Sequence, residues 1–149
     1  MQRSRLSIAA VVTLVVFTLA SIVPVAKAQQ RLSDKDVETL LNNLKSDTKK
    51  FRSSFNSGVG KSTIRKTSQE KDAKNLVQEF EKQTEATLNK FKQDQRAETE
   101  LSALLNTGGQ IDKLLNATPM GDQANADWSK VRTELDGVAK QFNLEFPPK

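Results

Sequence analysis

The sequence predicts an all-α protein, an up-and-down four-helix bundle preceded by an N-terminal signal peptide. Three observations favour this fold class. Apolar residues recur every three to four positions through most of the chain, no segment alternates apolar and polar residues as a strand does, and the N-terminal segment differs sharply in composition from the rest. The chain holds no cysteine and no histidine. Its stability must therefore come from packing without disulfides, and it lacks the usual general base and thiol nucleophile.

The N-terminal segment has the order of a secretory signal: basic, apolar, cleavable. Two arginines precede an almost uncharged run from Leu6 to Val23, and a small-x-small cleavage pattern ends at Ala28. We expect residues 1–28 to be the signal peptide and residues 29–149 a single helical-bundle domain, periplasmic or extracellular. Because the apolar run has nearly the length that spans a bilayer, an uncleaved inner-membrane anchor at residues 6–23 is the alternative.

Apolar spacing and capping signals divide the rest of the chain into helices. The expected helices cover, approximately, residues 33–56, 67–93, 95–117 and 119–143. The first is the most clearly marked, since Ser33 can cap its first turn with Asp36 three residues on. Leu32 and Val37 hold the positions of a hydrophobic staple. Asparagine and glycine within residues 56–60 are expected to end it.

The second and third helices are marked by local signals. Thr67, with Glu70 three residues on, forms a capping-box pattern. A jump in the apolar register near Asp94 predicts a bend or tight turn, with one continuous helix from Thr67 to Asn106 as the alternative. The Gly108-Gly109 pair lies close to the apolar phase of the third helix and so can sit inside it, at a cost of about 2 kcal/mol.

The fourth helix carries an uninterrupted apolar stripe. Pro119 suits its first turn. Trp128 lies on the stripe, which indicates a core anchor rather than a ligand platform. Arg132 and Asp136 are four residues apart, so they can pair with each other or reach acids on a neighbouring helix and fix its register.

The stretch SGVGKST, residues 57–63, looks like a phosphate-binding loop but is predicted to be an inter-helix turn. The phosphate-binding motif needs a glycine where Phe55 stands. It also follows a buried strand, whereas this stretch follows an amphipathic helix, and no apolar run here ends in an aspartate to hold magnesium. We therefore expect no nucleotide and no cofactor.

Carboxylates occur in clusters on the expected helices. They are Glu79, Glu81 and Glu85, then Glu98 and Glu100, then Glu134 with Asp136. Metal sites in helix bundles typically pair inward glutamates with a histidine three residues away, and the chain has no histidine. Most of these acids fall beside lysines and off the apolar stripes, which favours solvated helix faces. We expect no metal site, no catalytic residue and no enzymatic activity.

The most function-like feature is a basic region at residues 45–74, where nine basic residues outnumber three acidic ones. Such a region can attract anionic envelope polymers or lipid headgroups, and the competing interpretation is a solvated surface that keeps the protein soluble. Aromatic residues for base stacking are scarce there, so specific nucleic-acid recognition is not expected. The candidate surface comprises Lys49, Lys50, Arg52, Lys61, Arg65 and Lys66.

The C-terminal stretch DWSKVRTELDGVAKQFNLEF resembles the closing segment of a family of small exported bacterial helical-bundle proteins with no assigned activity. The pattern is carried by Trp128, Val131, Arg132, Leu135, Asp136, Ala139, Phe142 and Leu144. RLSDKDVETLLNNL, FRSSF and VQEFEKQTEATLNKF are similar to that family as well. Family members often carry tyrosine where Phe142 stands and lack the glycines of SGVGKS. The resemblance implies export and a helical fold and transfers no site.

These observations together predict an exported, non-enzymatic helical bundle that binds an anionic partner, if any, through its basic region. An envelope-stress chaperone or adaptor is one alternative, and it would show an exposed apolar groove. A membrane-anchored spacer is another, and it would keep the apolar N-terminal run. A weak carboxylate enzyme would require acids that converge in a pocket and titrate abnormally.

Overall fold

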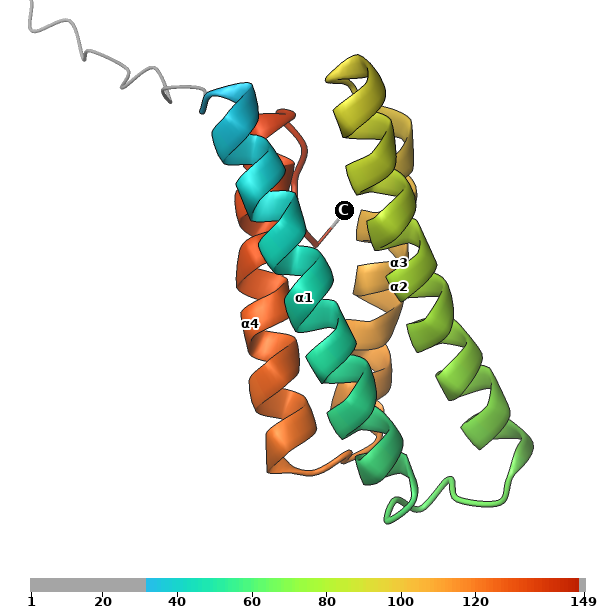
Figure 1. Cartoon of the computed structure of the whole chain (residues 1–149). Helices are drawn as coiled ribbons and strands as arrows, with labels where there is room; N and C mark the ends of the chain where they lie inside the picture. Colours follow the sequence, from blue (N-terminus) through green and yellow to red (C-terminus); the bar gives the residue numbers. More distant parts are fainter. Residues whose placement is uncertain (1–31, 148–149) are drawn as a thin grey trace, which may run out of the picture. The chain divides into compact units, whose positions relative to one another are not determined.

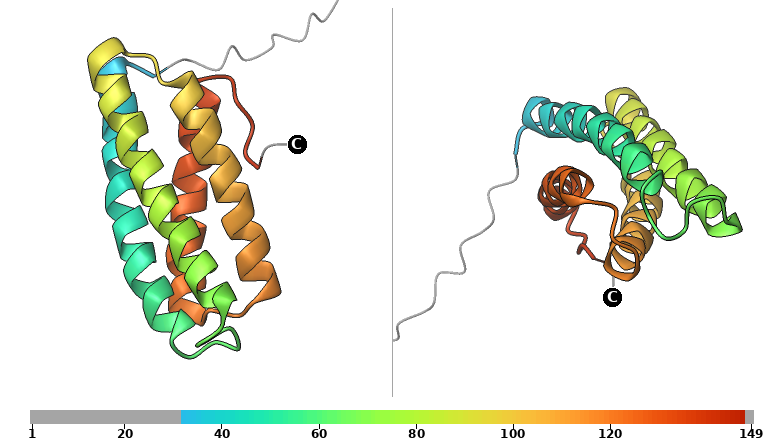
Figure 2. Two further views of the ribbon diagram at one scale, coloured as in Figure 1. Left: turned by 90° about the vertical axis from the view of Figure 1, so that its right-hand side faces the viewer. Right: turned by 90° about the horizontal axis from the view of Figure 1, so that it is seen from below.

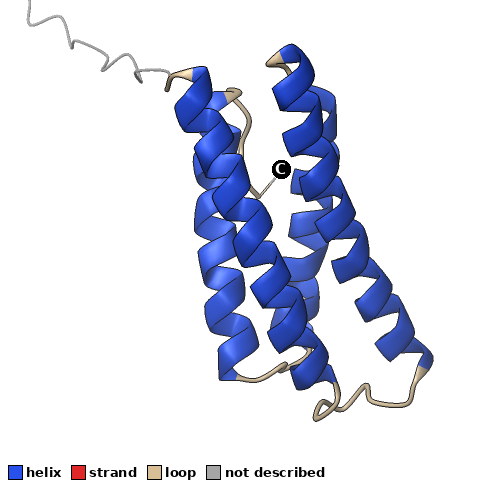
Figure 3. Cartoon of the chain, in the orientation of Figure 1, coloured by secondary structure: helices blue, strands red, loops and turns tan. Residues whose placement is uncertain are grey.

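The computed structural model describes residues 32–147, and every regular element in that range is a helix (Figures 1 and 3). The helices are α1 Asp34–Val59, α2 Ser68–Asp94, α3 Glu98–Ala117 and α4 Asp122–Gln141. The all-α, four-helix prediction is therefore confirmed for this part of the chain. The expected signal peptide at 1–28 and the alternative anchor at 6–23 lie outside the described residues.

The helices run alternately up and down, each packs against the next one in the sequence, and α4 returns to pack against α1 (Figures 1 and 2). The α1–α4 contact is the most extensive and the α3–α4 contact the least. Trp128 is buried at the centre, as predicted, with its ring centroid 4.9 Å from that of Phe51 and 5.4 Å from that of Phe80. Tilted and edge-on aromatic pairs of this kind stabilise the core by about 0.5–1.5 kcal/mol each beyond the area that they bury.

α1 starts as predicted but ends later. The N–H of Asp36 donates to Ser33 Oγ at 3.2 Å, so the predicted cap is formed. Leu32 is 38% exposed and therefore does not form a buried staple. The helix continues to Val59, and Gly60 follows it with φ −59°, which is a right-handed conformation. Left-handed glycine is consequently not what ends this helix.

Gly58 allows the last turn of α1 to touch the connection between α3 and α4. A Cβ on Gly58 would lie 1.9 Å from the carbonyl oxygen of Met120, so only glycine fits there. Met120, 2% exposed, fills this end of the core. Pro119 lies in the same connection and not in a helical turn, because α4 begins at Asp122, after Gly121 with φ 90°. The predicted start at 119 is thus too early.

The connection between α1 and α2 is ordered by local hydrogen bonds and is held to the bundle by Ile64. The capping box predicted at Thr67 is not formed. Instead the Thr67 hydroxyl donates to the Ile64 carbonyl at 2.6 Å, and the Glu70 carboxylate accepts the N–H of Lys66 at 2.5 Å. Ile64 is 6% exposed and belongs to the core cluster. These contacts fix the backbone that carries the basic residues of this connection.

α2 and α3 are separate helices, as the jump in apolar register near Asp94 predicts. Gln95 has φ 53°, the left-handed conformation that commonly follows the end of a helix. Ala97, at the start of α3, is buried under the turn. A continuous helix through this point is therefore wrong.

The C-terminal segment, residues 142–147, covers the side of the bundle where α3 and α4 contact each other least (Figure 2). Gly108 lies inside α3, as predicted, and a Cβ there would lie 3.1 Å from the ring of Phe146. The guanidinium of Arg132 lies 5.8 Å from the centroid of that ring. Phe142 packs edge-on against Phe91, with their centroids 5.9 Å apart. The glycine inside α3 thus makes room for an aromatic side chain.

Candidate functional site

The structure divides the six predicted surface residues into two groups of three. The first group lies along the middle of α1, and each of its cations is ion-paired. The pairs are Lys49 with Glu85 at 3.7 Å, Lys50 with Asp47 at 2.7 Å, and Arg52 with Glu81. Each carboxylate reduces the field of its cation, but Glu85 is shared with Lys45 and Asp47 with Lys130, so the positive charge of this group is reduced and not cancelled.

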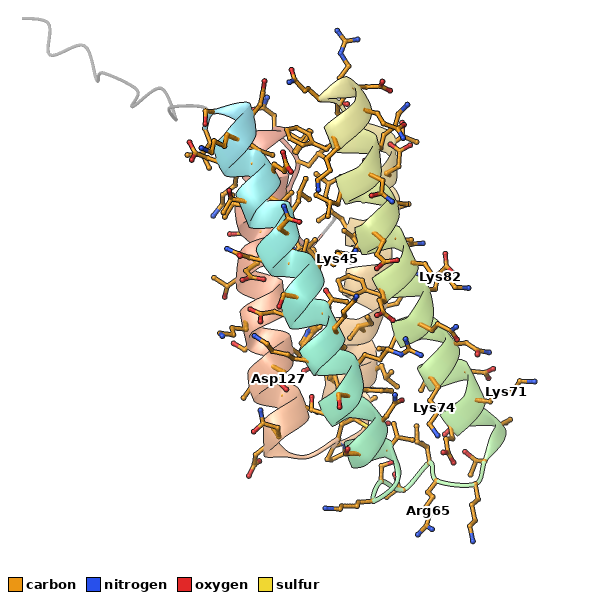
Figure 4. All side chains as sticks on the ribbon, viewed as in Figure 1. Lys45, Arg65, Lys71, Lys74, Lys82 and Asp127 are labelled. Carbon is orange, nitrogen blue, oxygen red and sulfur yellow. The ribbon has the colours of Figure 1, made fainter. Side chains whose placement is uncertain are left out.

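The second group, Lys61, Arg65 and Lys66, lies in the α1–α2 connection and is exposed. Lys71, in the first turns of α2, is also exposed. None of these four side chains forms an ion pair with another residue of the range 32–147. Figure 4 shows Arg65 and Lys71 extending away from the helices at this end. We call Lys61, Arg65, Lys66 and Lys71 the basic end.

The nearby carboxylate of Glu70 offsets the charge of the basic end only in part, because its two oxygens already accept hydrogen bonds and Arg65 acts on it through charge alone. It accepts hydrogen bonds from Lys74 Nζ at 2.6 Å and from the backbone N–H of Lys66. These two bonds lower the pKa of Glu70, the lysine contributing most. The carboxylate therefore stays ionised while it orders the backbone next to the cations.

A groove of about 440 Å³ lies between α2, α3 and the α1–α2 connection, next to the basic end. Its lining is mixed, with apolar residues that range from buried to exposed and polar residues that are mostly exposed. The apolar lining is Ile64, Ala73, Leu76, Leu114 and Ala117, and the polar lining is Gln69, Asp72, Gln110 and Thr118. Sequence reasoning missed this groove, because it forms from three segments whose relative register only the fold defines.

Two carboxyl groups meet between α1 and α4, which the sequence analysis did not predict. Asp47 is 8% exposed, with Oδ1 2.7 Å from Lys50 Nζ and Oδ2 3.8 Å from Lys130 Nζ. Glu134 is half-buried, and its Oε2 has no hydrogen-bond partner while the group is ionised. The expected solvated position of Glu134 is therefore wrong. The spacing of both acids could have indicated their burial, because each lies three residues after one core residue and four residues before another. Glu134, for example, lies between the core residues Val131 and Val138.

The environments of these two acids shift their proton affinities in opposite directions. Burial and the neighbouring carboxylate of Asp47 raise the pKa of Glu134 to about 7. The hydrogen bond from Lys50 lowers the pKa of Asp47. The pair can therefore share one proton, which Glu134 donates to Asp47. Neither acid lines the groove, and no group of three or more acids suited to a metal ion occurs among residues 32–147.

Asp112 links α3 to α4 through two hydrogen bonds. Its Oδ1 accepts the indole N–H of Trp128 at 2.7 Å, and its Oδ2 accepts Nε of Arg132 at 3.1 Å. Arg132 therefore reaches across to a neighbouring helix, which is one of the two predicted possibilities. Asp136 pairs instead with Lys140 at 2.6 Å. The contacts of Asp112 therefore fix the register of α4 relative to α3.

No helix within residues 32–147 has the length and apolar character needed to cross a membrane. Comparisons of the chain with protein-family models, with curated proteins and with solved structures found no match.

Proposed function

We propose that this chain is an exported, non-enzymatic helical-bundle protein that binds an anionic partner through the basic end. Export is supported by the signal-like order of residues 1–28 and by the family resemblance of the helical part. The observation that carries the binding proposal is the set of four exposed cations without ion-pair partners among the described residues, gathered at one end of the bundle.

Unpaired cations favour this end over the middle of α1 for a physical reason. A partner that approached Lys49, Lys50 or Arg52 would have to compete with carboxylates already in place. A partner that approached the basic end would meet uncompensated positive charge on a backbone held by hydrogen bonds. Attraction of this kind acts over about 10 Å at moderate salt and is screened as ionic strength rises.

The partner chemistry is a surface or polymer with closely spaced phosphate, sulfate or carboxylate groups. An anionic polymer and an anionic lipid headgroup share that chemistry, and two assays separate them. Retention on immobilised heparin reports a polymer. Co-sedimentation with vesicles of phosphatidylglycerol, compared with vesicles of phosphatidylcholine alone, reports a lipid surface.

The test compares two triple variants of the purified protein with the same change in net charge. The first is Lys61→Gln with Arg65→Gln and Lys66→Gln. The matched control neutralises scattered exposed lysines that form no ion pair with other residues of 32–147: Lys35→Gln, Lys82→Gln and Lys113→Gln. We expect the first variant to lose about tenfold or more in affinity at low salt, and the control about twofold or less. Equal losses, or no salt-sensitive binding by the parent protein, would overturn the proposal.

Two alternatives from the sequence stay as competing proposals. A chaperone or adaptor would suppress the aggregation of unfolded client proteins, whereas a protein that binds through the basic end would not. A membrane-anchored spacer would retain residues 1–28, so N-terminal sequencing of the native protein separates it from an exported one.

A further inference from the structure

We infer that the groove between α2 and α3 takes the acyl chain of an anionic amphiphile whose headgroup lies against the basic end. This inference rests on the proposed function and narrows its partner to a class of molecule. The groove and the cations are independent features of the fold, and their adjacency carries the argument.

The groove has the size and the lining that a single chain requires. Its volume of about 440 Å³ lies within the range of sites for small molecules. Leu76 and Leu114 are only half-buried and both line it, so apolar surface here is left partly in contact with water. A methylene chain placed between them would remove that surface from water, which is favourable in proportion to the area covered.

Charge sets the orientation of the bound molecule. Ile64 lines the groove and directly precedes the exposed Arg65 and Lys66, so these cations belong to the segment that borders the groove, although none of them lines it. Asp72, which lines the groove on α2, repels an anion from the lining itself. The headgroup is therefore held at the connection, and the chain extends along α2 towards Leu76.

A neutral lipid or a cationic detergent fits this arrangement less well. A neutral headgroup would leave the exposed cations without a partner, and a cationic headgroup would be repelled by them. A soluble polyanion would satisfy the cations but leave the two half-buried leucines partly in contact with water. An anionic group joined to one apolar chain matches both features at once.

The test uses dodecyl sulfate, dodecyl phosphocholine and dodecyl trimethylammonium, each below its micelle concentration, with heparin as the probe that has no chain. Titration calorimetry gives the affinity of each. We expect dodecyl sulfate to bind at least about tenfold more tightly than either of the other two amphiphiles. Equal affinity for all three would show apolar adsorption alone and would overturn the inference.

A matched pair of leucines on α3 tests the groove itself. Leu114 and Leu115 are adjacent and both half-buried, but only Leu114 lines this groove, whereas Leu115 lines a hollow beside Trp128. We expect Leu114→Gln to weaken dodecyl sulfate binding about fivefold or more and to leave heparin retention unchanged. Leu115→Gln is expected to alter neither. Equal effects of the two substitutions would overturn the inference.

A second pair guards against variants that simply unfold. Ala117 is exposed and lines the groove, so Ala117→Trp should fill it without disturbing the core. Ala103→Trp places the same side chain at an exposed position of α3 that does not line it. With helicity checked by circular dichroism, only Ala117→Trp should abolish dodecyl sulfate binding. If heparin binding survives while neither groove variant matters, this inference fails and the proposed function stands. If the parent protein retains neither probe, both fall.

Discussion

Glu134 has an environment that favours its protonated form. Its Oε2 is buried without a partner while the group is ionised, and Asp47 lies beside it on α1. Lys130 on α4 and Lys50 on α1 oppose this effect, while Asp127 acts on Lys50 from α4. Burial, the largest cause, raises the pKa of Glu134 from 4.5 to about 7. Between pH 4.5 and about 7, Glu134 therefore keeps a proton in the folded protein that it releases in the unfolded chain.

The linkage fixes the direction of the pH dependence. Between pH 4.5 and about 7 the folded state binds more protons at Glu134 than the unfolded state, so stability falls as pH rises through that window. Asp47 acts at the acid end, because its lowered pKa makes stability fall when the pH drops below the ordinary range of an aspartate.

We predict that Glu134→Gln raises the stability at pH 8 by about 1–2 kcal/mol and flattens the decrease between pH 5 and pH 8. A glutamine amide can donate to Asp47 at every pH, as the protonated glutamate does. Urea unfolding at both pH values measures the effect, with the exposed Glu79→Gln as control. Parallel pH curves for the parent protein and Glu134→Gln would contradict the prediction.

Ion pairs link α1 and α2 along the seam where the two helices meet. Arg52 contacts Glu81, and Lys45 Nζ lies 3.0 Å from Glu85 Oε1. In each of these pairs α1 supplies the cation and α2 the anion. Since the two helices are antiparallel neighbours, several pairs along one seam favour a single register over its alternatives.

Reversing one pair tests this role of the seam. Arg52→Glu places two acids together where the Glu81 side chain is only 15% exposed, and we expect a loss of about 1–2 kcal/mol. Adding Glu81→Arg should restore most of it. Lys61→Glu, at a residue of the connection without an ion-pair partner among residues 32–147, should cost little. Urea unfolding of the parent protein, Arg52→Glu, Glu81→Arg and the double variant gives the coupling energy, and no recovery in the double variant would sink the idea.

The bundle as a whole closes unevenly, because α3 and α4 contact each other least. The C-terminal segment supplies the missing apolar surface, with Phe146 against Gly108 and Arg132. Closure of the core thus depends on residues beyond the last helix.

We therefore predict that Phe146→Ala lowers the free energy of unfolding by about 1–3 kcal/mol, although the residue lies outside every helix. Leu32→Ala, at the exposed leucine beyond the other end of the helical region, should cost less than about 0.5 kcal/mol. Thermal and urea unfolding measure both. A Phe146→Ala protein as stable as its parent would show that the segment contributes nothing to closure.

Periodicity predicted the whole-molecule fold because every helix buries one continuous stripe, and Trp128 followed from the same pattern. It could not predict the burial of Met120 or the partial burial of Phe146, since neither lies on a helix and only tertiary packing covers them. Asp47 lies at the spacing of a core position, three residues after Leu44 and four before Phe51. Its burial was nevertheless not predicted, because an aspartate is normally expected at the surface. Which cations form ion pairs depends on the register between helices. The sequence alone therefore could not separate the paired cations of the basic region from the unpaired ones.

The contact of Gly58 with Met120 has a consequence for selectivity. It pins one end of the α1–α2 connection against the rest of the protein, and Ile64 pins its middle. Positive groups mounted on so stiff a frame keep set separations and lose little freedom when a ligand arrives. Such a frame distinguishes ligands by the spacing of their negative groups. A flexible basic tail would distinguish them only by the number of negative groups that they carry.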